Sequence, residues 1–315
     1  IPIMYGCNNF CTYCIVPYVR GRERSRSIDN ILEEVEKAVA RGYTEITLLG
    51  QNVDSYGKDF LRDGALDKLG ATDATSVQEP FAALLRAVDR VPGLQRVHFM
   101  TSHPRDMSEE VIRTVAEGTH LCEQFHVALQ SGSDRVLKEM NRGYTGARFL
   151  ELVRLIRRYI PDASITTDII VGFPGETEED FEATCRLVEE ARFDAAYTFL
   201  YSPRSGTPAA RRKDQVPDAV KHARLQRLMD IQNRISLSIH EGWRGKTVEV
   251  MAEGPTEKDS RIWSGRTRGN KLVLWPQGEG TEGGEGCLRP VVPGQLVHVL
   301  ITNPQTWLLK GRRVD

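Results

Sequence analysis

The order of apolar and polar residues changes character along this chain. Over residues 1–243, short apolar runs alternate with longer amphipathic segments. Several of the runs are nearly continuous, such as Ile46 to Leu49 and Ile169 to Val171, which is typical of strands in a parallel sheet that helices cover. We therefore predict strands at residues 3–6, 45–50, 96–101, 125–130, 165–171 and 195–201.

Helical patterns separate these strands, and capping residues mark where the helices begin. Ser27, Ser108 and Thr177 each precede a segment with helical periodicity, where a side-chain oxygen can accept from the first free backbone N–H groups. The corresponding helices are predicted over 28–41, 109–117 and 178–192. Repeated strand–helix units predict an α/β fold, a partial six-unit (βα) barrel, in which the functional site lies at the C-terminal ends of the strands.

A second domain is predicted after this part of the chain. A long helix is expected over 217–241, and the pattern changes after Gly242 and Gly245. Short apolar runs separated by Gly, Pro and Asn then predict a small all-β barrel of the OB-like kind. Its strands are predicted at 247–252, 261–267, 271–275, 296–302 and 307–310. We place the two domains at 1–243 and 244–315.

One segment, residues 54–80, interrupts the alternation of strands and helices. It is long, polar and rich in Gly, Asp and Ala. A connection of this length without a regular pattern predicts a loop that is either functional or mobile. The sequence does not choose between these two alternatives.

Composition sets limits on this picture without supplying a function. Hydrophobic residues make up 40% of the chain and charged residues 27%, an ordinary globular balance, and no apolar run reaches the ~18 residues of a membrane span. The net charge of −1 means that nucleic-acid binding must depend on local basic patches. No secretory segment is visible, so we predict a cytoplasmic, reducing location with Cys122 and Cys185 as buried thiols and Cys287 as an exposed one.

Three further cysteines, Cys7, Cys11 and Cys14, lie close together near the start of the chain. Their spacing is C-x3-C-x2-C, with an aromatic residue before the last cysteine. Three thiolates can hold three irons of a four-iron cluster and leave the fourth iron open to a small molecule. A disulfide would leave one cysteine unpaired, and structural zinc requires four ligands, usually in C-x2-C pairs, whereas the nearest histidine, His98, is distant in sequence. The spacing therefore favours an iron–sulfur cluster.

Small and polar residues gather where the predicted strands end, at residues 50–57, 101–104, 130–134, 172–176 and 201–208. Glycine lets a backbone approach a ligand closely and polar groups can orient it, although the same residues make ordinary turns. Because five such loops meet at one face of the predicted barrel, we favour a site there. His103 is either a base in this site or a structural histidine.

Two basic clusters flank the same face. The first follows the cysteines and the second follows the last strand of the predicted barrel. Phosphate contacts from such clusters would give an affinity that weakens with salt, although a solvated run of charges is the alternative. The clusters consist of Arg20, Arg22, Arg24 and Arg26, and of Arg204, Arg211, Arg212 and Lys213.

Several of these motifs together resemble one enzyme family. The resemblance is to the radical S-adenosylmethionine (SAM) methylthiotransferases. It is carried by the run Gly6 to Cys14 with the basic segment after it, and by residues 130–133, 168–176 and 201–204. Residues 264–267 and 307–311 resemble a TRAM domain, a small RNA-binding β-barrel. Within the family, residues 51–57 and 101–104 resemble the MiaB-type branch, which acts on tRNA.

The resemblance implies cofactors and a role for individual residues. Cys7, Cys11 and Cys14 would ligate a 4Fe–4S cluster that cleaves SAM. The other residues implied to meet SAM are Tyr13 near the adenine, Gly50 and Gln51 at the methionine amino group, Gln130, Ser131 and Asp168 on the ribose side, and Gly172 on the adenine side. Arg20, Arg22, Arg24, Arg204, Arg211 and Arg212 would contact RNA.

The implied reaction methylthiolates the adenine ring of N6-isopentenyladenosine next to the tRNA anticodon. An electron donor, such as a flavodoxin-type reductant, drives cleavage of SAM to a 5′-deoxyadenosyl radical, which removes hydrogen from the ring. Sulfur insertion and methyl transfer from a second SAM follow. The alternatives are methylthiolation of a ribosomal protein or of threonylcarbamoyladenosine in tRNA, or an RNA-binding module without catalysis.

The family also has an N-terminal domain whose three further cysteines hold an auxiliary 4Fe–4S cluster, and residues 1–315 do not contain that cysteine pattern. We therefore expect this chain to cleave SAM but to require that domain as a partner for methylthiolation. The measurement is analysis of tRNA after incubation with purified 1–315, SAM and reductant. Methylthiolated product without an added partner would contradict the expectation.

Overall fold

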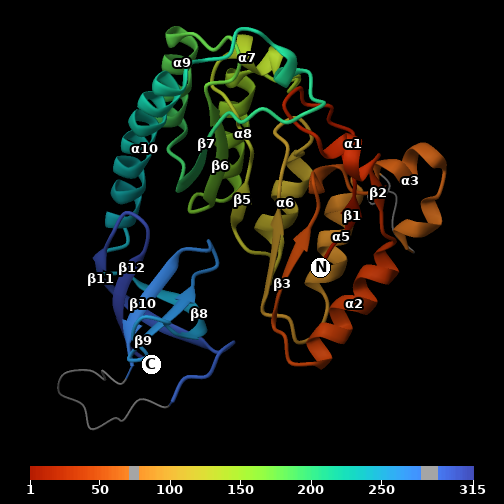
Figure 1. Ribbon diagram of the computed structural model, residues 1–315. Helices are drawn as coiled ribbons and strands as arrows, with labels where there is room; N and C mark the ends of the chain where they lie inside the picture. Colours follow the sequence, from red (N-terminus) through yellow and green to blue (C-terminus); the bar gives the residue numbers. More distant parts are fainter. Residues whose placement is uncertain (71–77, 278–289) are drawn as a thin grey trace. The chain divides into compact units, whose positions relative to one another are not determined.

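The computed structural model describes residues 1–70, 78–277 and 290–315 (Figure 1). The described chain forms two compact units, Ile1–Gln232 and Asn233–Asp315. The boundary between them lies within the long helix α10 (Asp218–Glu241), and the sequence-based division at 243/244 falls just after this helix.

Parallel strands form the centre of the first unit. Strand β3 pairs in parallel with β4, and β6 pairs in parallel with both β5 and β7. A parallel bridge from Pro2 to Leu49 joins the N-terminal segment to β3. Another parallel bridge, from Ser102 to Val127, joins the segments that follow β4 and β5. The described strands of this unit are β1 (Met4–Tyr5), β2 (Arg24–Ser25), β3 (Glu45–Leu49), β4 (Arg96–Met100), β5 (Gln124–His126), β6 (Ser164–Val171) and β7 (Ala195–Leu200).

These bounds confirm the predicted strands except for the one expected at 125–130, which ends at His126. Beyond it, the Thr167 hydroxyl donates to the Val127 carbonyl and accepts from the Leu129 N–H, so a side chain replaces ladder bonds between backbones. Gln130 then takes a left-handed conformation with φ of 69°. The strand pattern of apolar residues therefore continues past the point where regular pairing stops.

Helices form a layer on one side of these strands (Figure 1). Each of five amphipathic helices packs on the next in chain order, and α2 buries Ile28, Ile31 and Val35. The predicted caps are confirmed, since Ser27, Ser108 and Thr177 each accept from a backbone N–H of the first turn. The five helices are α2 (Ile28–Ala40), α5 (Pro80–Asp89), α6 (Glu109–Glu117), α8 (Gly146–Tyr159) and α9 (Glu178–Ala191).

The prediction of one long loop over 54–80 is wrong for the part that the structure describes. The chain forms η1 (Val53–Ser55), α3 (Lys58–Asp63) and η2 (Leu66–Leu69), and it buries Tyr56, Phe60 and Leu69. Apolar side chains too widely spaced to show a period are enough to pack this segment onto the unit. Residues 71–77 lie outside the described ranges.

Shorter elements complete the first unit. They are α1 (Val16–Arg20), α7 (Asp134–Glu139) and η3 (Ala209–Arg211). Cys122 and Cys185 are buried free thiols, as predicted, whereas Cys287 lies outside the described residues.

The second unit contains a closed barrel of five strands, which confirms the predicted small barrel. Its strand order is β10-β12-β11-β8-β9, and the parallel pair β10–β12 closes it among otherwise antiparallel neighbours. The predicted last strand at 307–310 is displaced, since Trp307 is exposed and pairing begins at Leu309. The strands are β8 (Thr247–Pro255), β9 (Ile262–Arg266), β10 (Leu272–Pro276), β11 (Leu296–Pro304) and β12 (Leu309–Arg313).

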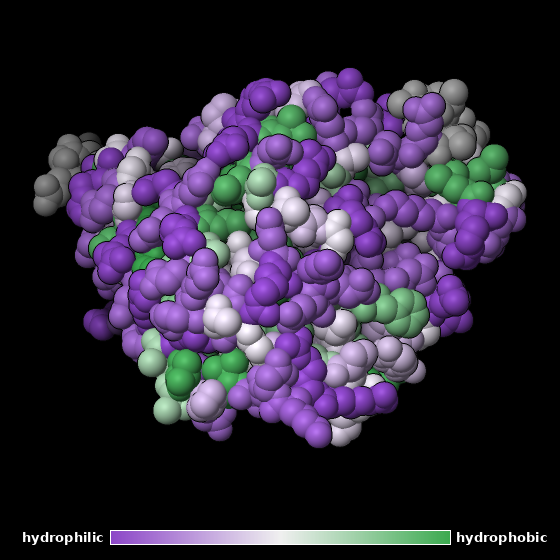
Figure 2. All heavy atoms as spheres, turned by 90° about the horizontal axis from the view of Figure 1, so that it is seen from above, coloured by the Kyte–Doolittle hydropathy of each residue, from purple (hydrophilic) through white to green (hydrophobic). Residues whose placement is uncertain are grey.

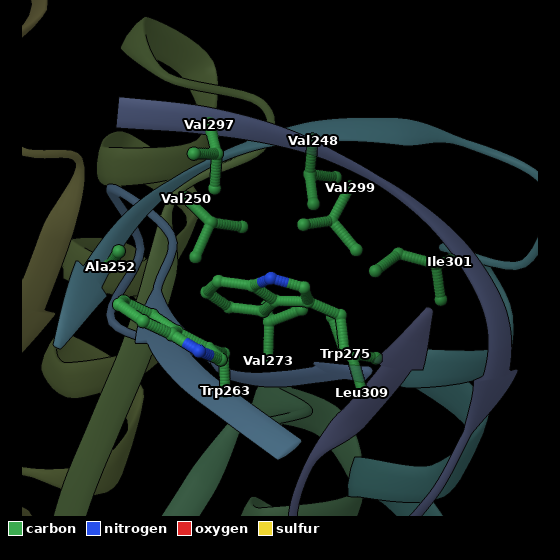
Figure 3. Close-up of a cluster of buried hydrophobic side chains, with 10 residues drawn as sticks. All are labelled: Val248, Val250, Ala252, Trp263, Val273, Trp275, Val297, Val299, Ile301 and Leu309. Carbon is green, nitrogen blue, oxygen red and sulfur yellow. The ribbon is translucent and has the colours of Figure 1, made fainter. Parts of the chain in front are cut away.

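Alternating side chains from all five strands fill the barrel (Figure 3). The indole of Trp275 lies at the centre, surrounded by Val248, Val250 and Val299. Strands approach closely at Gly311, where an added Cβ would collide with the Leu300 carbonyl. The barrel is therefore a packed core.

The surface of the molecule is largely polar. Figure 2 shows one face on which hydrophobic atoms are exposed in small, separate patches. Within residues 1–70, 78–277 and 290–315, we find no helix with both the length and the apolar character needed to cross a membrane.

Truncation of the central tryptophan should destabilise the barrel. Replacing Trp275, which is 1% exposed, with Ala should lower the free energy of unfolding by about 3–5 kcal/mol, because a cavity replaces a large buried side chain. Trp307→Ala is the matched control, since Trp307 is 61% exposed, and it should change stability by less than about 0.5 kcal/mol. Denaturant unfolding followed by circular dichroism measures both; equal losses would contradict the assigned core.

Candidate cofactor site

The cysteine loop begins with a close approach between two backbones. Gly6 has φ of 76°, and an added Cβ would collide with the carbonyl oxygen of Arg22. The Cys7 N–H donates to the Gly21 carbonyl at 3.1 Å. Glycine at position 6 therefore lets the start of the loop lie directly against residues 21–22.

A buried carboxylate holds the same side of the loop. Glu23 is 7% exposed, and its two oxygens accept from the backbone N–H and the side-chain amide of Asn8 at 3.0 and 3.1 Å. The Glu23 N–H donates in return to the Asn8 side chain at 3.3 Å. Charge-assisted bonds of this kind are stronger than neutral ones, so this pair fixes the loop between Cys7 and Cys11.

The other side of the loop is attached to α7 and η3. The Thr12 N–H and hydroxyl donate to the carbonyls of Met140 and Glu139 at 3.1 and 2.8 Å. The Thr12 carbonyl accepts from Ala209 N–H at 2.9 Å. The loop is thus held by segments that are more than 100 residues away in the chain.

The three cysteines of this loop are free thiols. Cys11 is buried and Cys7 and Cys14 are half-buried, and burial raises the pKa of Cys7 to about 11 and also raises that of Cys14. No group of three His, Cys, Asp or Glu side chains in the described ranges is arranged to hold a single metal ion. A cluster binds each thiolate through a different iron, so it fits three thiols on one loop better than a lone zinc ion does.

A buried cation beside Cys11 also fits an anionic cluster. Arg142 is 4% exposed, and its Nη1 lies 3.4 Å from the Cys11 sulfur. Its other bonds go to the Ala128 carbonyl and the Tyr144 hydroxyl, which are neutral. A buried charge without a partner of opposite sign is costly, and an iron–sulfur cluster on three thiolates would supply that partner.

Next to the loop lies a cavity of about 310 Å³ at the ends of β6 and β7. It brings together three residues that the sequence predicted to bind cofactor, namely Tyr13, Gln130 and Asp168, and one predicted to contact RNA, Arg204. Its volume is in the range of small-molecule sites. The remaining lining residues are Ile170, Phe199, Leu200, Tyr201 and Ser202.

Two of the lining residues are fixed by their neighbours. Gln130 is tied through its backbone to β6, donating to Asp168 and accepting from Ile170 at 2.8 and 2.9 Å. The Asp168 carboxylate contacts Nε2 of His126 at 3.2 Å, and Nδ1 of that ring lies 3.0 Å from the Thr166 hydroxyl. His126 is therefore a positioning residue for Asp168, and the apolar strand pattern around it gave no signal of this.

Aromatic side chains form the other part of the cavity. Tyr13 packs beside the buried Phe173 and Tyr201, and Phe199 of β7 is 51% exposed. From the sequence alone, Phe199 is only a strand residue. The signal that was present is its alternation with Tyr197 along β7, which places both rings on one face of the strand.

The remaining predicted cofactor residues lie outside the lining of this cavity. The Ser131 hydroxyl contacts the Thr184 hydroxyl at 3.3 Å. Gly172 has φ of 76° with its N–H donating to Glu176, whereas Gly50 lies against Met4 and Gln51 is half-buried in the loop after β3. Their roles toward SAM stay predictions.

His103 has the environment of a structural histidine. It is 5% exposed, its ring packs edge-on against Tyr144, and Nδ1 accepts from the Arg105 N–H at 3.2 Å. Burial and the nearby Arg142 lower its pKa to about 3, so the ring is neutral at physiological pH. Asp54 accepts from the His103 N–H, and burial raises the pKa of this carboxyl to about 7.

The predicted RNA-contacting arginines fall into two groups. Arg212 pairs with Glu139 and Asp214 and lies over the Phe173 ring, so its charge is already compensated. The other five are exposed and form no ion pair with any described acid; these are Arg20, Arg22, Arg24, Arg204 and Arg211.

Loss of the Glu23 carboxylate should release the cysteine loop. Glu23→Ala removes two charge-assisted bonds, each contributing about 1.5–3 kcal/mol, so iron bound per chain after anaerobic reconstitution should fall well below that of the unmodified protein. Glu33→Ala removes only an exposed pair with Lys37 and should leave iron content unchanged. Full iron loading of Glu23→Ala would show that this carboxylate does not hold the loop.

Comparisons with known proteins agree with this geometry. The chain is 51% identical over 311 residues to the tRNA-2-methylthio-N(6)-dimethylallyladenosine synthase of Acetivibrio thermocellus. The aligned region covers 99% of this chain and 59% of that protein. It is 52% identical over 315 residues to the synthase of the same name from Moorella thermoacetica. That alignment covers 100% of this chain and 65% of the relative. The chain thus spans about three fifths of the length of these relatives. The model of the radical SAM superfamily matches residues 1–188, more than half of the chain, and the chain therefore belongs to that superfamily.

Proposed function

We propose that this chain is the SAM-cleaving and RNA-binding part of a tRNA methylthiotransferase that modifies the adenine ring of N6-isopentenyladenosine next to the anticodon. The single observation that carries the proposal is the placement of three free thiols on one loop beside a cavity lined by Tyr13, Gln130 and Asp168. Relatives about half identical over the whole chain bear the name of this activity.

Cys7, Cys11 and Cys14 would hold the 4Fe–4S cluster, which supplies the electron for reductive cleavage of SAM. The chain's own residues bind and orient. Asp168, held by His126, presents carboxylate oxygens that can accept from ribose hydroxyls. The rings of Tyr13 and Phe199 provide apolar surface that suits an adenine and excludes water from it.

We assign the first unit to the partial six-unit barrel of radical SAM enzymes. The chain-order succession of parallel strands supports this assignment. Such a fold collects its functional groups at the C-terminal ends of strands, which is where the cavity lies.

We assign the barrel of the second unit to a TRAM domain that binds the RNA. The support is an apolar groove of about 840 Å³ whose lining includes Ile262, Leu272 and Leu274 together with Lys258 and Lys310. Apolar surface next to basic side chains suits unpaired bases and their phosphates. In the first unit, the five exposed arginines supply further uncompensated positive charge.

The complete reaction involves further partners. We propose that sulfur insertion uses the auxiliary cluster of an N-terminal methylthiotransferase domain and that a flavodoxin-type protein supplies electrons. A cytoplasmic location agrees with the five described cysteines, which are all free thiols.

The test is anaerobic reconstitution with iron and sulfide, followed by incubation with SAM and a reductant. The unmodified chain should bind about four irons and release 5′-deoxyadenosine. Cys11→Ala should reduce 5′-deoxyadenosine to background, whereas Cys122→Ala, a change at another buried thiol, should leave it unchanged. Bound zinc, or 5′-deoxyadenosine formation that survives Cys11→Ala, would overturn the proposed site.

The substrate is tested with the same protein. An anticodon stem-loop carrying N6-isopentenyladenosine should bind more tightly than a ribosomal-protein peptide, with an affinity that decreases as salt increases. Preference for the peptide would overturn the choice of substrate while leaving the cofactor site intact.

A further inference from the structure

Arg142 occupies an unusual electrostatic position between α7 and α8. It is one of the few arginines that the structure buries, with 4% of the residue exposed. Two other buried arginines have acidic partners: Arg224 pairs with Glu176 at 3.0 Å and Arg313 with Asp315 at 3.2 Å. Arg142 forms no ion pair with an Asp or Glu of the described ranges, and its polar neighbours are neutral groups and the Cys11 thiol.

The guanidinium is held in a fixed orientation. Nε donates to the Tyr144 hydroxyl at 3.2 Å, Nη2 donates to the Ala128 carbonyl at 2.8 Å, and the remaining edge presents Nη1 to the Cys11 sulfur at 3.4 Å. The Tyr144 hydroxyl in turn donates to the Leu129 carbonyl at 2.6 Å. Because two nitrogens of the planar guanidinium are already bound, the third can donate to one acceptor with little further loss of side-chain entropy.

This placement has a physical cost unless an anion is nearby. A buried guanidinium keeps its proton, so it cannot reduce its charge by titration. Removal of such a charge from water is unfavourable, and neutral acceptors offset only part of that cost. The one anionic group that the cysteine loop can provide at this position is a thiolate-bound cluster.

We propose that Arg142 is the charge partner of the 4Fe–4S cluster and a positioning residue that sets its reduction potential, acting through a hydrogen bond to the Cys11 sulfur. The inference rests on the cofactor assigned in the proposed function. Reduction adds one electron from an external low-potential donor and moves no proton, so the cluster gains one negative charge. A fixed positive charge beside a ligand sulfur stabilises that reduced state and raises the potential.

The experiment is potentiometric titration of the reconstituted full chain, followed by electron paramagnetic resonance in the absence of RNA. Arg142→Met retains much of the volume and removes the charge, and Arg142→Lys retains the charge and loses the fork. Arg86→Met is the control, since Arg86 is half-buried but pairs with Glu110 and Thr114 of α6. Iron content and circular dichroism are recorded for every variant.

The potential of Arg142→Met should be more negative than that of the unmodified chain, with Arg142→Lys between them and Arg86→Met unchanged. A folded Arg142→Met that loses the cluster, while Arg142→Lys retains it, would equally support a requirement for the charge. An unchanged potential in Arg142→Met would overturn the inference, and so would a Lys variant as defective as the Met variant. Absence of iron from the unmodified chain would instead overturn the cofactor assignment itself.

Discussion

The parallel pairing of strands is the constraint on which the candidate site depends. Because β6 runs parallel to β5 and β7, the C-terminal ends of these strands lie at one edge. Gln130, Asp168 and Tyr201, which are tens of residues apart in sequence, therefore line one cavity. The amphipathic helices form a layer on one side of the strands (Figure 1), where each packs on the next in chain order.

Hydrogen bonds to distant segments hold the cysteine loop against this edge. Glu23 fixes one side of the loop and the α7 carbonyls fix the other. Without these bonds, three thiols on a short loop would sample many arrangements. Fixing the loop costs conformational entropy, and the hydrogen bonds offset that cost before a cofactor binds. Burial raises the pKa values of Cys7 and Cys14, so cofactor binding must displace protons and is coupled to the integrity of these contacts.

Charge compensation distinguishes basic residues that stabilise the fold from those available to a ligand. Arg224 and Arg212 are matched by acids. Arg224 joins α10 to the start of α9, and Arg212 joins the segment after η3 to α7. The exposed arginines of the two clusters have no such partners among the described acids. Arg142 is a third kind, buried and matched only by neutral groups and a thiol, and this combination connects it to the chemistry of the site.

The sequence by itself determined the features that depend on near neighbours in the chain. These features are the strand periodicity, the caps at Ser27, Ser108 and Thr177, the five short strands of the second unit and the spacing of the cysteines. Each depends on residues a few positions apart. Only the tertiary structure decided that 54–69 packs as short helices, that β5 ends at His126 and that Arg212 is paired. It also decided that His126 contacts Asp168 and that Arg142 contacts Cys11. These outcomes depend on burial and on partners far away in the chain, and no local pattern encodes either.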